Sequence, residues 1–115
     1  MAYKRTDRVN ALLQRELGTL ISEELQDPRI GFTTVTSVEV TPDLRTARVH
    51  VSVLGDDVVA AQTMRALEDA KPHLRHELGA RTDLRFVPAL ELVRDRSAER
   101  ATRISRLLRE ARNDG

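Results

Sequence analysis

The segment from Val58 to Leu78 constrains the fold most, because its apolar pattern is helical but contains one break. Apolar residues recur at every third or fourth position, the spacing that lines one face of a helix. The break comes where Lys71 occupies an apolar position and Pro72 follows it. Proline lacks a backbone N–H and crowds the preceding turn, so a helix bends or restarts there. We therefore predict two helices that meet at a basic elbow of Ala70, Lys71 and Pro72, with Ala70 turned toward the core.

The whole chain, residues 1–115, is predicted to be a single domain. Its 115 residues can bury roughly two-thirds of the unfolded surface without covalent staples. Cysteine is absent, which excludes a disulfide framework and a cysteine-ligated metal. No apolar run approaches the ~20 residues that span a bilayer, and the N-terminus lacks the apolar core of a signal peptide. We expect a cytoplasmic protein with no membrane contact, whose C-terminal part after about residue 108 frays or is disordered.

Charge is distributed unevenly along the chain, although the net charge is only +1. Residues 1–15 carry +3, residues 16–70 carry −6, and residues 71–115 carry +4. Basic ends around an acidic middle indicate that one side of the fold faces a polyanion. The alternative is that these charges are ordinary solvated helix faces.

The N-terminal part predicts a helix followed by a turn. A wide apolar stripe runs from Thr6 to Leu25, and Thr6 or Asp7 can cap the start of this helix. The segment Asp27–Gly31 contains a proline and ends in a glycine that can adopt a positive φ. This segment is predicted to be the turn that leads into the sheet.

Two segments rich in valine and threonine predict an antiparallel hairpin. The first strand, residues 32–40, places Thr34, Thr36, Val38 and Val40 on one face. The second, Ala47–Val53, alternates valines with polar residues, as expected for a half-buried strand. The hairpin should therefore have one face on the core.

The C-terminal part predicts a third strand and a last helix. The strand spans Leu84–Val93 and lies at an edge or carries a bulge, because Pro88 cannot donate to a ladder. Its inward candidates are Leu84, Phe86, Leu90 and Leu92. The crossover before it is long enough for parallel pairing with the second strand. Ser97 caps the last helix, whose narrow apolar stripe indicates loose docking. The predicted class is α+β with a three-stranded mixed sheet.

The chain shows no pattern typical of an active site. It has no glycine-rich phosphate loop, nucleophile elbow or paired-histidine metal motif. His73 and His76 are three residues apart on a helix, but no third ligand accompanies them. We therefore expect no catalytic activity, metal site, cofactor or small-molecule substrate. Aromatic residues are scarce, which argues against stacking platforms and leaves arginine as the main means of contacting nucleic acid.

Several local motifs together resemble the ribosome-binding factor A family. The motifs are Arg5-x-x-Arg8-Val9, Leu25-Gln-Asp-Pro-Arg-Ile-Gly31, Thr36-x-Val38-x-Val40-x-x-Asp43-Leu44-x-x-Ala47-x-Val49-x-Val51-Ser52, Leu84-Arg-Phe-Val-Pro-x-Leu90 and Asp95. The resemblance covers about residues 4–108. It implies a type II KH-like domain: helix, hairpin, kinked helix pair, strand and C-terminal helix. This family lacks the GxxG loop of nucleotide-clamping KH domains and has an interhelical Ala-x-Gly kink, which aligns here with Ala70, Lys71 and Pro72.

The resemblance also implies a function. Members of the family bind free small (30S) ribosomal subunits, act late in 16S rRNA maturation near the precursor end, and support growth in the cold. We expect a non-catalytic RNA-binding factor of this kind that is a monomer off the ribosome. The alternatives are a generic KH-type protein that binds other RNA and a ferredoxin-like protein-interaction module.

The residues expected to contact rRNA are basic and are distributed over the start of the first helix, the hairpin, the elbow and the third strand. They are Arg5, Arg8, Arg45, Arg48, Lys71, Arg75, Arg81 and Arg85. Arginine suits this role because its planar guanidinium can bind two phosphate oxygens or stack on a base. Replacing Pro72 by alanine is expected to straighten the elbow and draw Lys71 inward.

Overall fold

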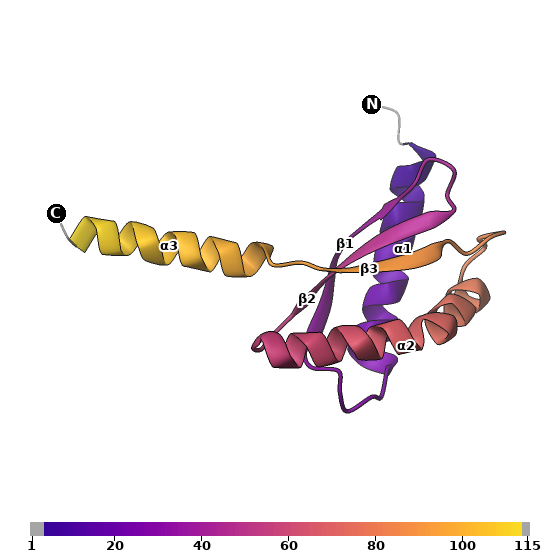
Figure 1. The fold of residues 1–115 in the computed structure, drawn as a ribbon. Coiled ribbons are helices and arrows are strands. Elements are labelled where there is room, and N and C mark those ends of the chain that lie inside the picture. Colours follow the sequence, from indigo (N-terminus) through magenta and orange to yellow (C-terminus); the bar gives the residue numbers. More distant parts are fainter. Residues whose placement is uncertain (1–3, 114–115) are drawn as a thin grey trace.

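The computed structural model describes residues 4–113, and a three-stranded sheet organises these residues. The elements in chain order are α1 (Arg5–Thr19) with a π-helical turn η1 (Leu20–Glu24), β1 (Thr33–Val40), β2 (Thr46–Val53), α2 (Asp57–Arg81), β3 (Ala89–Arg94) and α3 (Ser97–Asn113). Figure 1 shows the sheet with α1 and α2 beside it and α3 extending away from the body. This is the α+β order predicted from the sequence.

The sheet is mixed, as predicted. Its strand order is β1-β2-β3, with β1 antiparallel to β2 and β2 parallel to β3. In the parallel pair, Val49 lies opposite Leu92. Both outer strands are edges, which confirms the edge position predicted for the third strand from Pro88.

A β-bulge in β1 overturns the face assignment predicted for that strand. The pairs on either side of the bulge are Val35 with Val51 and Ser37 with His50. Thr36 is therefore an extra residue, and the strand changes faces at that point. Thr34 and Thr36 are exposed, whereas Val35 is buried on the same side as Val38. The prediction that Thr34 and Thr36 share the face of Val38 is wrong because strict alternation does not survive a bulge.

The core lies between one face of the sheet and the two helices α1 and α2. Its buried members come from all five of these elements: Val9, Leu13, Leu17, Val35, Val38, Ala47, Val49, Val51, Leu67, Leu74, Leu78 and Leu90, together with Leu20 and Ile21 of η1. The first helix begins at Arg5, one residue before the predicted start. Lys4 is its N-cap, and the Asp7 carboxylate accepts a hydrogen bond from the Lys4 backbone N–H at 3.2 Å.

The turn after η1 depends on close packing and on one buried hydroxyl. Gly31 has no positive φ, contrary to the prediction; instead, a Cβ there would lie 3.1 Å from Cγ1 of Val59. Thr63 of α2 is fully buried, and its hydroxyl donates to the Arg29 carbonyl and accepts from the Gly31 N–H. Glycine therefore lets α2 approach the turn closely, and a larger residue would require the Val59 side chain to shift.

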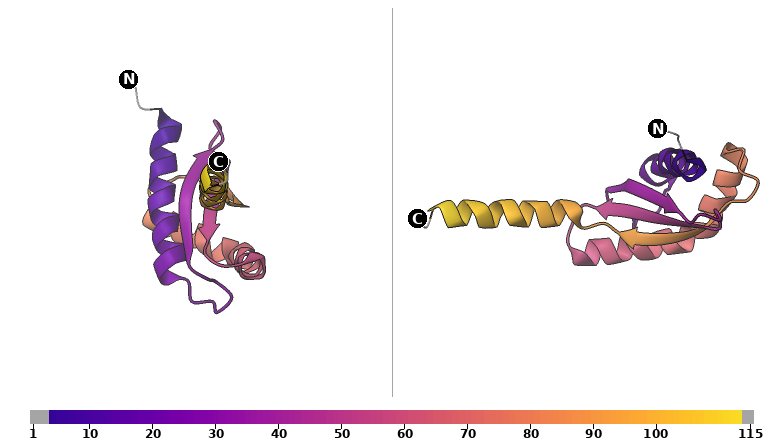
Figure 2. Two further views of the ribbon diagram at one scale, coloured as in Figure 1. Left: turned by 90° about the vertical axis from the view of Figure 1, so that its left-hand side faces the viewer. Right: turned by 90° about the horizontal axis from the view of Figure 1, so that it is seen from above.

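The predicted elbow is a bend within one helix. α2 is continuous through Pro72, so the prediction of two separate helices is wrong. Figures 1 and 2 show that its axis curves in the later part of the helix. A proline removes a single hydrogen bond, and the turns on either side can continue. Ala70 packs against the core, as predicted, whereas the Lys71 side chain is half-buried.

The third strand is shorter than predicted. It begins at Ala89, and Pro88 lies fully buried immediately before it. The Ala89 N–H donates to the Arg45 carbonyl at 2.8 Å, which brings the strand into the sheet. Residues 82–88 form a loop, and Phe86, predicted to point inward, has 79% of its surface exposed. Phe86 points outward because it lies in this loop and not in the strand.

α3 projects from the body as an arm (Figures 1 and 2). The molecule extends 59 Å along its longest axis and only 19 Å along its shortest. The apolar side chains of the arm, Ile104, Leu107 and Leu108, are all more than half exposed. The predicted docking of this stripe is therefore wrong. The helix continues to Asn113, whereas residues 114–115 lie outside the described part of the chain.

Candidate nucleic-acid interface

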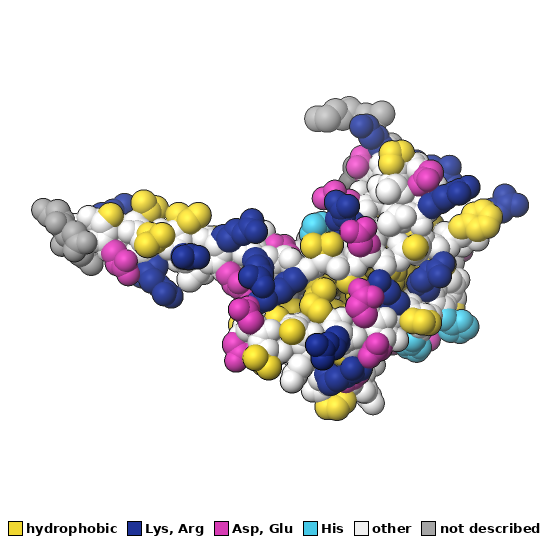
Figure 3. Space-filling view, in the orientation of Figure 1, with side chains coloured by type: hydrophobic (Ala, Val, Ile, Leu, Met, Phe, Trp, Pro, Cys, Tyr) yellow, Lys and Arg dark blue, Asp and Glu magenta, His cyan; other side chains and the backbone are white. Residues whose placement is uncertain are grey.

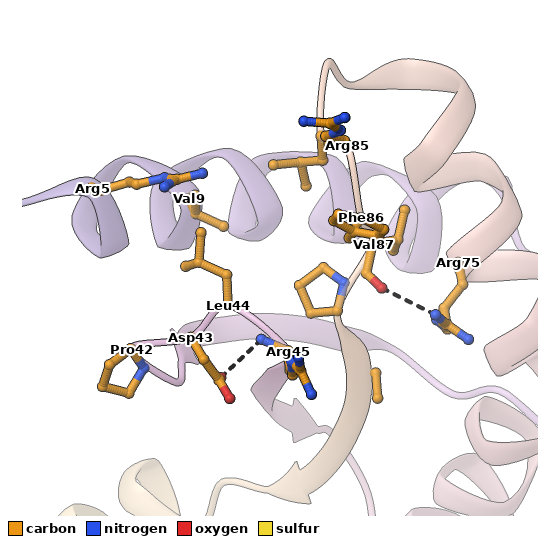
Figure 4. Close-up of a pocket in the computed structure, with 13 residues that line it drawn as sticks. Arg5, Val9, Pro42, Asp43, Leu44, Arg45, Arg75, Arg85, Phe86 and Val87 are labelled. Atoms are coloured by element: carbon orange, nitrogen blue, oxygen red, sulfur yellow. Dashed lines mark hydrogen bonds between the residues drawn. The ribbon is translucent and has the colours of Figure 1, made fainter.

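A groove of about 780 Å³ lies where three distant segments of the chain meet. The segments are the start of α1, the turn between β1 and β2, and the loop between α2 and β3, with one side chain added from α2. Figure 4 shows the residues that line it. We call this surface the basic groove, because four arginines line it: Arg5, Arg45, Arg75 and Arg85.

The basic groove carries an excess of positive charge. Its only carboxylate, among the lining residues, belongs to Asp43. That carboxylate accepts hydrogen bonds from the Thr41 hydroxyl at 2.6 Å and from the Arg45 backbone N–H at 3.1 Å. The hydroxyl, followed by the backbone bond, lowers the pKa of Asp43. Asp43 is therefore ionised at neutral pH and offsets one of the four positive charges, so the lining residues keep a net positive charge.

In the described part of the chain, three of the four arginines have guanidinium groups without a partner. Within residues 4–113, the side chains of Arg5, Arg45 and Arg85 make no hydrogen bond or ion pair. All three are exposed. Charged groups of one sign gathered around a concave surface raise the local concentration of oppositely charged ligands. The arrangement is suited to binding phosphate.

The hairpin turn presents Arg45 through an uncommon backbone conformation. Leu44 has a φ of 61°, in the left-handed region that leucine rarely adopts. Its N–H donates to the Thr41 carbonyl at 2.8 Å, and its side chain packs against the core. In Figure 4 that side chain points toward Val9 of α1. The packing of Leu44 offsets the backbone strain of roughly 1–2 kcal/mol and fixes the turn against α1.

The loop before β3 is anchored at both ends while its middle faces outward. The Arg75 guanidinium donates to the Val87 carbonyl at 3.0 Å (Figure 4). Leu84 and Val87 pack against the core. Arg85 and Phe86, the two residues between them, are exposed. The loop therefore holds one cation and one aromatic ring at the rim of the basic groove.

The other predicted contact residues lie outside the basic groove. Arg8 is exposed on α1, and Arg48 lies on the sheet with its Nε 3.6 Å from Glu91. Lys71 pairs with Glu68 at 2.7 Å. Basic side chains also lie along α3, interspersed with apolar ones, and at the end of the body beside the loop between α2 and β3 (Figure 3). RNA contacts of Arg8, Arg48 and Lys71 stay predictions.

Arg81 and Arg29 are each held by two carboxylates within the fold. Arg81 binds Glu24 through two guanidinium nitrogens and binds Glu77 at 3.2 Å. These bonds, that to Glu24 first, raise the pKa of Arg81, and the same contact lowers the pKa of Glu24. Arg29, in the turn that leads into the sheet, pairs in the same way with Asp27 at 2.8 Å and Asp69 at 3.0 Å. Arg81 therefore ties the end of α2 to η1, and a contact with RNA stays a prediction for it.

Sequence reasoning missed the roles of Leu44 and Phe86 in the basic groove. A leucine gives no signal of a left-handed turn, because glycine and asparagine are the usual residues there. For Phe86 a signal exists in Pro88, which ends the ladder and makes the residues before it a loop. Among residues 4–113, no group of histidine, aspartate and glutamate side chains could hold a metal ion, and no helix is long and apolar enough to cross a membrane.

Sequence comparison relates this chain to a known family. The family model described as ribosome-binding factor A matches residues 5–108. The ribosome-binding factor A of Desulfitobacterium hafniense is 46% identical over 114 residues, covering 99% of this chain and 91% of that protein. The protein of the same name from Roseiflexus castenholzii is 48% identical over 109 residues, covering 94% and 84% respectively.

Solved structures give the same relationship. The crystal structure of ribosome-binding factor A from Thermus thermophilus matches with a TM-score of 0.72 and 29% identity, over 80% of this chain and 97% of that one. A solution structure of a Thermotoga maritima protein described as a putative ribosome binding factor A matches with a TM-score of 0.65 and 30% identity, over 84% and 94%. A homology model of the T. thermophilus protein fitted into the map of its 30S complex matches with a TM-score of 0.57 and 31% identity, over 74% and 93%.

Proposed function

Because this chain belongs to the ribosome-binding factor A family, which has a KH-like fold, we propose that it binds the free small (30S) ribosomal subunit and assists late 16S rRNA maturation. It does so without catalysis, near the end of the rRNA precursor. The T. thermophilus relative is described in a 30S complex, which supports the choice of partner.

The observation that carries the proposal is the meeting of Arg5, Arg45, Arg75 and Arg85 at one groove. These residues come from the basic start of the chain, from its acidic middle and from its basic C-terminal part. The fold therefore gathers cations that are far apart in sequence onto one surface. Phosphates of folded rRNA are the ligand that such a surface fits.

Binding alone accounts for the assistance. A protein that binds one rRNA conformer more tightly than another shifts the folding equilibrium toward the first by the difference in binding free energy. The basic groove supplies affinity through phosphate contacts, and its shape selects among conformers. No covalent step is required.

The proposal is tested by reversing charge in the groove. The double variant Arg45→Glu, Arg85→Glu should lose co-sedimentation with purified small subunits at physiological salt. Its fold should be retained, because both side chains are exposed and unpaired within residues 4–113. Each phosphate contact removed should also reduce the log–log dependence of binding on salt by about 0.7–0.9.

The matched control reverses the same amount of charge outside the groove. Arg15 and Arg65 are exposed residues that do not line it. The double variant Arg15→Glu, Arg65→Glu should co-sediment like the wild type. Wild-type binding by the groove variant, or equal loss in both variants, would refute the assignment of the basic groove.

A further inference from the structure

Phe86 is exposed where nothing in the fold requires an aromatic ring. With 79% of its surface accessible, it is the most exposed of the large apolar residues in the described part of the chain. It lies beside Arg85 and among the lining residues of the basic groove (Figure 4). Exposing a phenylalanine forgoes the stabilisation that burial would give. The ring therefore contributes nothing visible to packing.

Several contacts hold the backbone of the loop that carries Phe86, so the position of the ring is well defined. Pro88 is fully buried, the Arg75 guanidinium holds the Val87 carbonyl, and Thr82 bonds to the Leu78 carbonyl at 2.6 Å. A ring held in this way loses little conformational entropy when a ligand stacks on it.

We infer that Phe86 is a stacking site for one unpaired nucleotide of the bound RNA, whose base lies on the ring while the flanking phosphates bind Arg5, Arg45 and Arg85. This inference rests on the proposed function and adds the kind of RNA that the basic groove accepts. A base within a duplex has no free face, so only an unpaired base can occupy the ring. The arginines around the ring can bind the RNA phosphates before and after the stacked nucleotide.

The charge of the groove favours RNA over an apolar protein segment as the occupant. An apolar segment that covered Phe86 would remove water from guanidinium groups that have no partner within residues 4–113, which is costly. RNA brings a phosphate for each nucleotide and replaces that water with charge-assisted hydrogen bonds. The one carboxylate of the groove, on Asp43, is already bound within the turn.

The chain contains a matched control for this site. Phe32 has 74% of its surface exposed and lies between η1 and β1, outside the basic groove. The full-length wild type is compared with Phe86→Leu, Phe86→Tyr and Phe32→Leu. The probes are a fluorescent, unstructured 12-nucleotide RNA and its blunt duplex, measured by anisotropy at one fixed salt concentration.

Phe86→Leu should weaken binding of the single-stranded RNA by roughly 5- to 150-fold, the range of one lost base–aromatic stack. Phe86→Tyr, which keeps the ring, and Phe32→Leu should bind as the wild type does. Binding of the duplex should be the same for all four proteins. A 2-aminopurine base in the single strand should be quenched by the wild type and by Phe86→Tyr, but not by Phe86→Leu.

Equal single-strand affinity for Phe86→Leu and the wild type, or equal weakening of the single strand and the duplex, would overturn the inference. If Phe86→Leu loses small-subunit binding but keeps RNA affinity, the ring contacts a ribosomal protein, which also overturns it. In each case the charge-reversal test on Arg45 and Arg85 still decides the proposed function separately. Phe86 is exposed, so its replacement should leave the fold intact.

Discussion

Thr63 shows how much one hydroxyl can contribute inside this fold. It is fully buried in α2, and it links two backbone groups of the turn after η1, the carbonyl of Arg29 and the N–H of Gly31. Both groups are partly shielded from water, so each needs a partner. The hydroxyl thereby joins α2 to a turn more than thirty residues earlier in the chain.

Thr63→Val should reduce the free energy of unfolding by about 1–3 kcal/mol, because it leaves two backbone groups without partners at nearly constant volume. Urea unfolding measures this loss, and hydrogen exchange should show faster exchange of the Gly31 amide. Thr63→Ser keeps the hydroxyl and should keep that protection. Unchanged protection of Gly31 in Thr63→Val would show that the hydrogen bond is dispensable.

Individual side-chain orientations could be predicted from the sequence only where the backbone is regular. Val49 and Val51 are buried as alternation required, because β2 has no irregularity. The face predicted for Thr34 is wrong because a bulge occurs at Thr36. No residue type in this segment marks the position of the bulge, so the sequence alone does not reveal it. Phe86 was placed inward because the strand was extended past Pro88. The orientations of Thr34 and Phe86 both depend on local backbone geometry, which the residue types in these segments indicate only weakly.

α2 combines a proline with uninterrupted helical structure. Its apolar residues on both sides of Pro72, including Leu67 and Leu74, are fully buried. Straightening the helix would expose Leu74 and Leu78, at roughly 1.5–3 kcal/mol each. The helix-propensity gain from removing a proline is about 3 kcal/mol at most. Core packing therefore maintains the bend, and Pro72 only lowers the free-energy cost of bending the helix.

Pro72→Ala should therefore keep the bend, keep small-subunit binding and raise the free energy of unfolding by up to about 3 kcal/mol. This differs from the expectation drawn from the sequence, that alanine would straighten the elbow. Urea unfolding and co-sedimentation provide the two measurements. Leu74→Ala serves as the contrast and should cost about 2–5 kcal/mol. Loss of stability or of binding in Pro72→Ala would show that the proline itself enforces the bend.

The elements themselves were predictable because their apolar periods are long and distinct. The helix from Thr6, the hairpin and the crossover all occur where the pattern placed them. The parallel pairing of β2 and β3 followed from the length of the crossover alone. α3 has the predicted apolar stripe, but the stripe alone does not show whether another part of the protein packs against it. The basic groove was partly predictable, since four of the eight arginines and lysines proposed for RNA binding line it.

The molecule consists of a packed body and a projecting arm, and the two contribute unequally to stability. No residue of α3 belongs to the core. The arm is tied to the body mainly where Arg94 meets Glu99 and Asp57 and where Asp95 bonds to Ser97 and Thr36. Exposed ion pairs of this kind contribute about 0–1 kcal/mol.

Deletion of residues 98–115 should therefore change the free energy of unfolding by less than about 1 kcal/mol. The deletion keeps Ser97, and with it the contacts of Asp95. Urea unfolding of the shortened and full-length chains measures the difference, and the m-value should fall only slightly, because α3 buries little surface. A loss above about 2 kcal/mol would indicate that the arm packs on the body in solution.

The basic groove also has a kinetic consequence. Arg5, Arg45 and Arg85 lie roughly 40 residues apart in sequence. The basic groove therefore forms only when α1, the hairpin and β3 have all packed together. Contacts between distant segments form late, after the entropy of closing long loops has been overcome. A nascent chain that has folded only its hairpin therefore cannot hold RNA in the groove. RNA bound there acts only on the completed fold and stabilises it by mass action, so binding and the completion of folding are thermodynamically coupled.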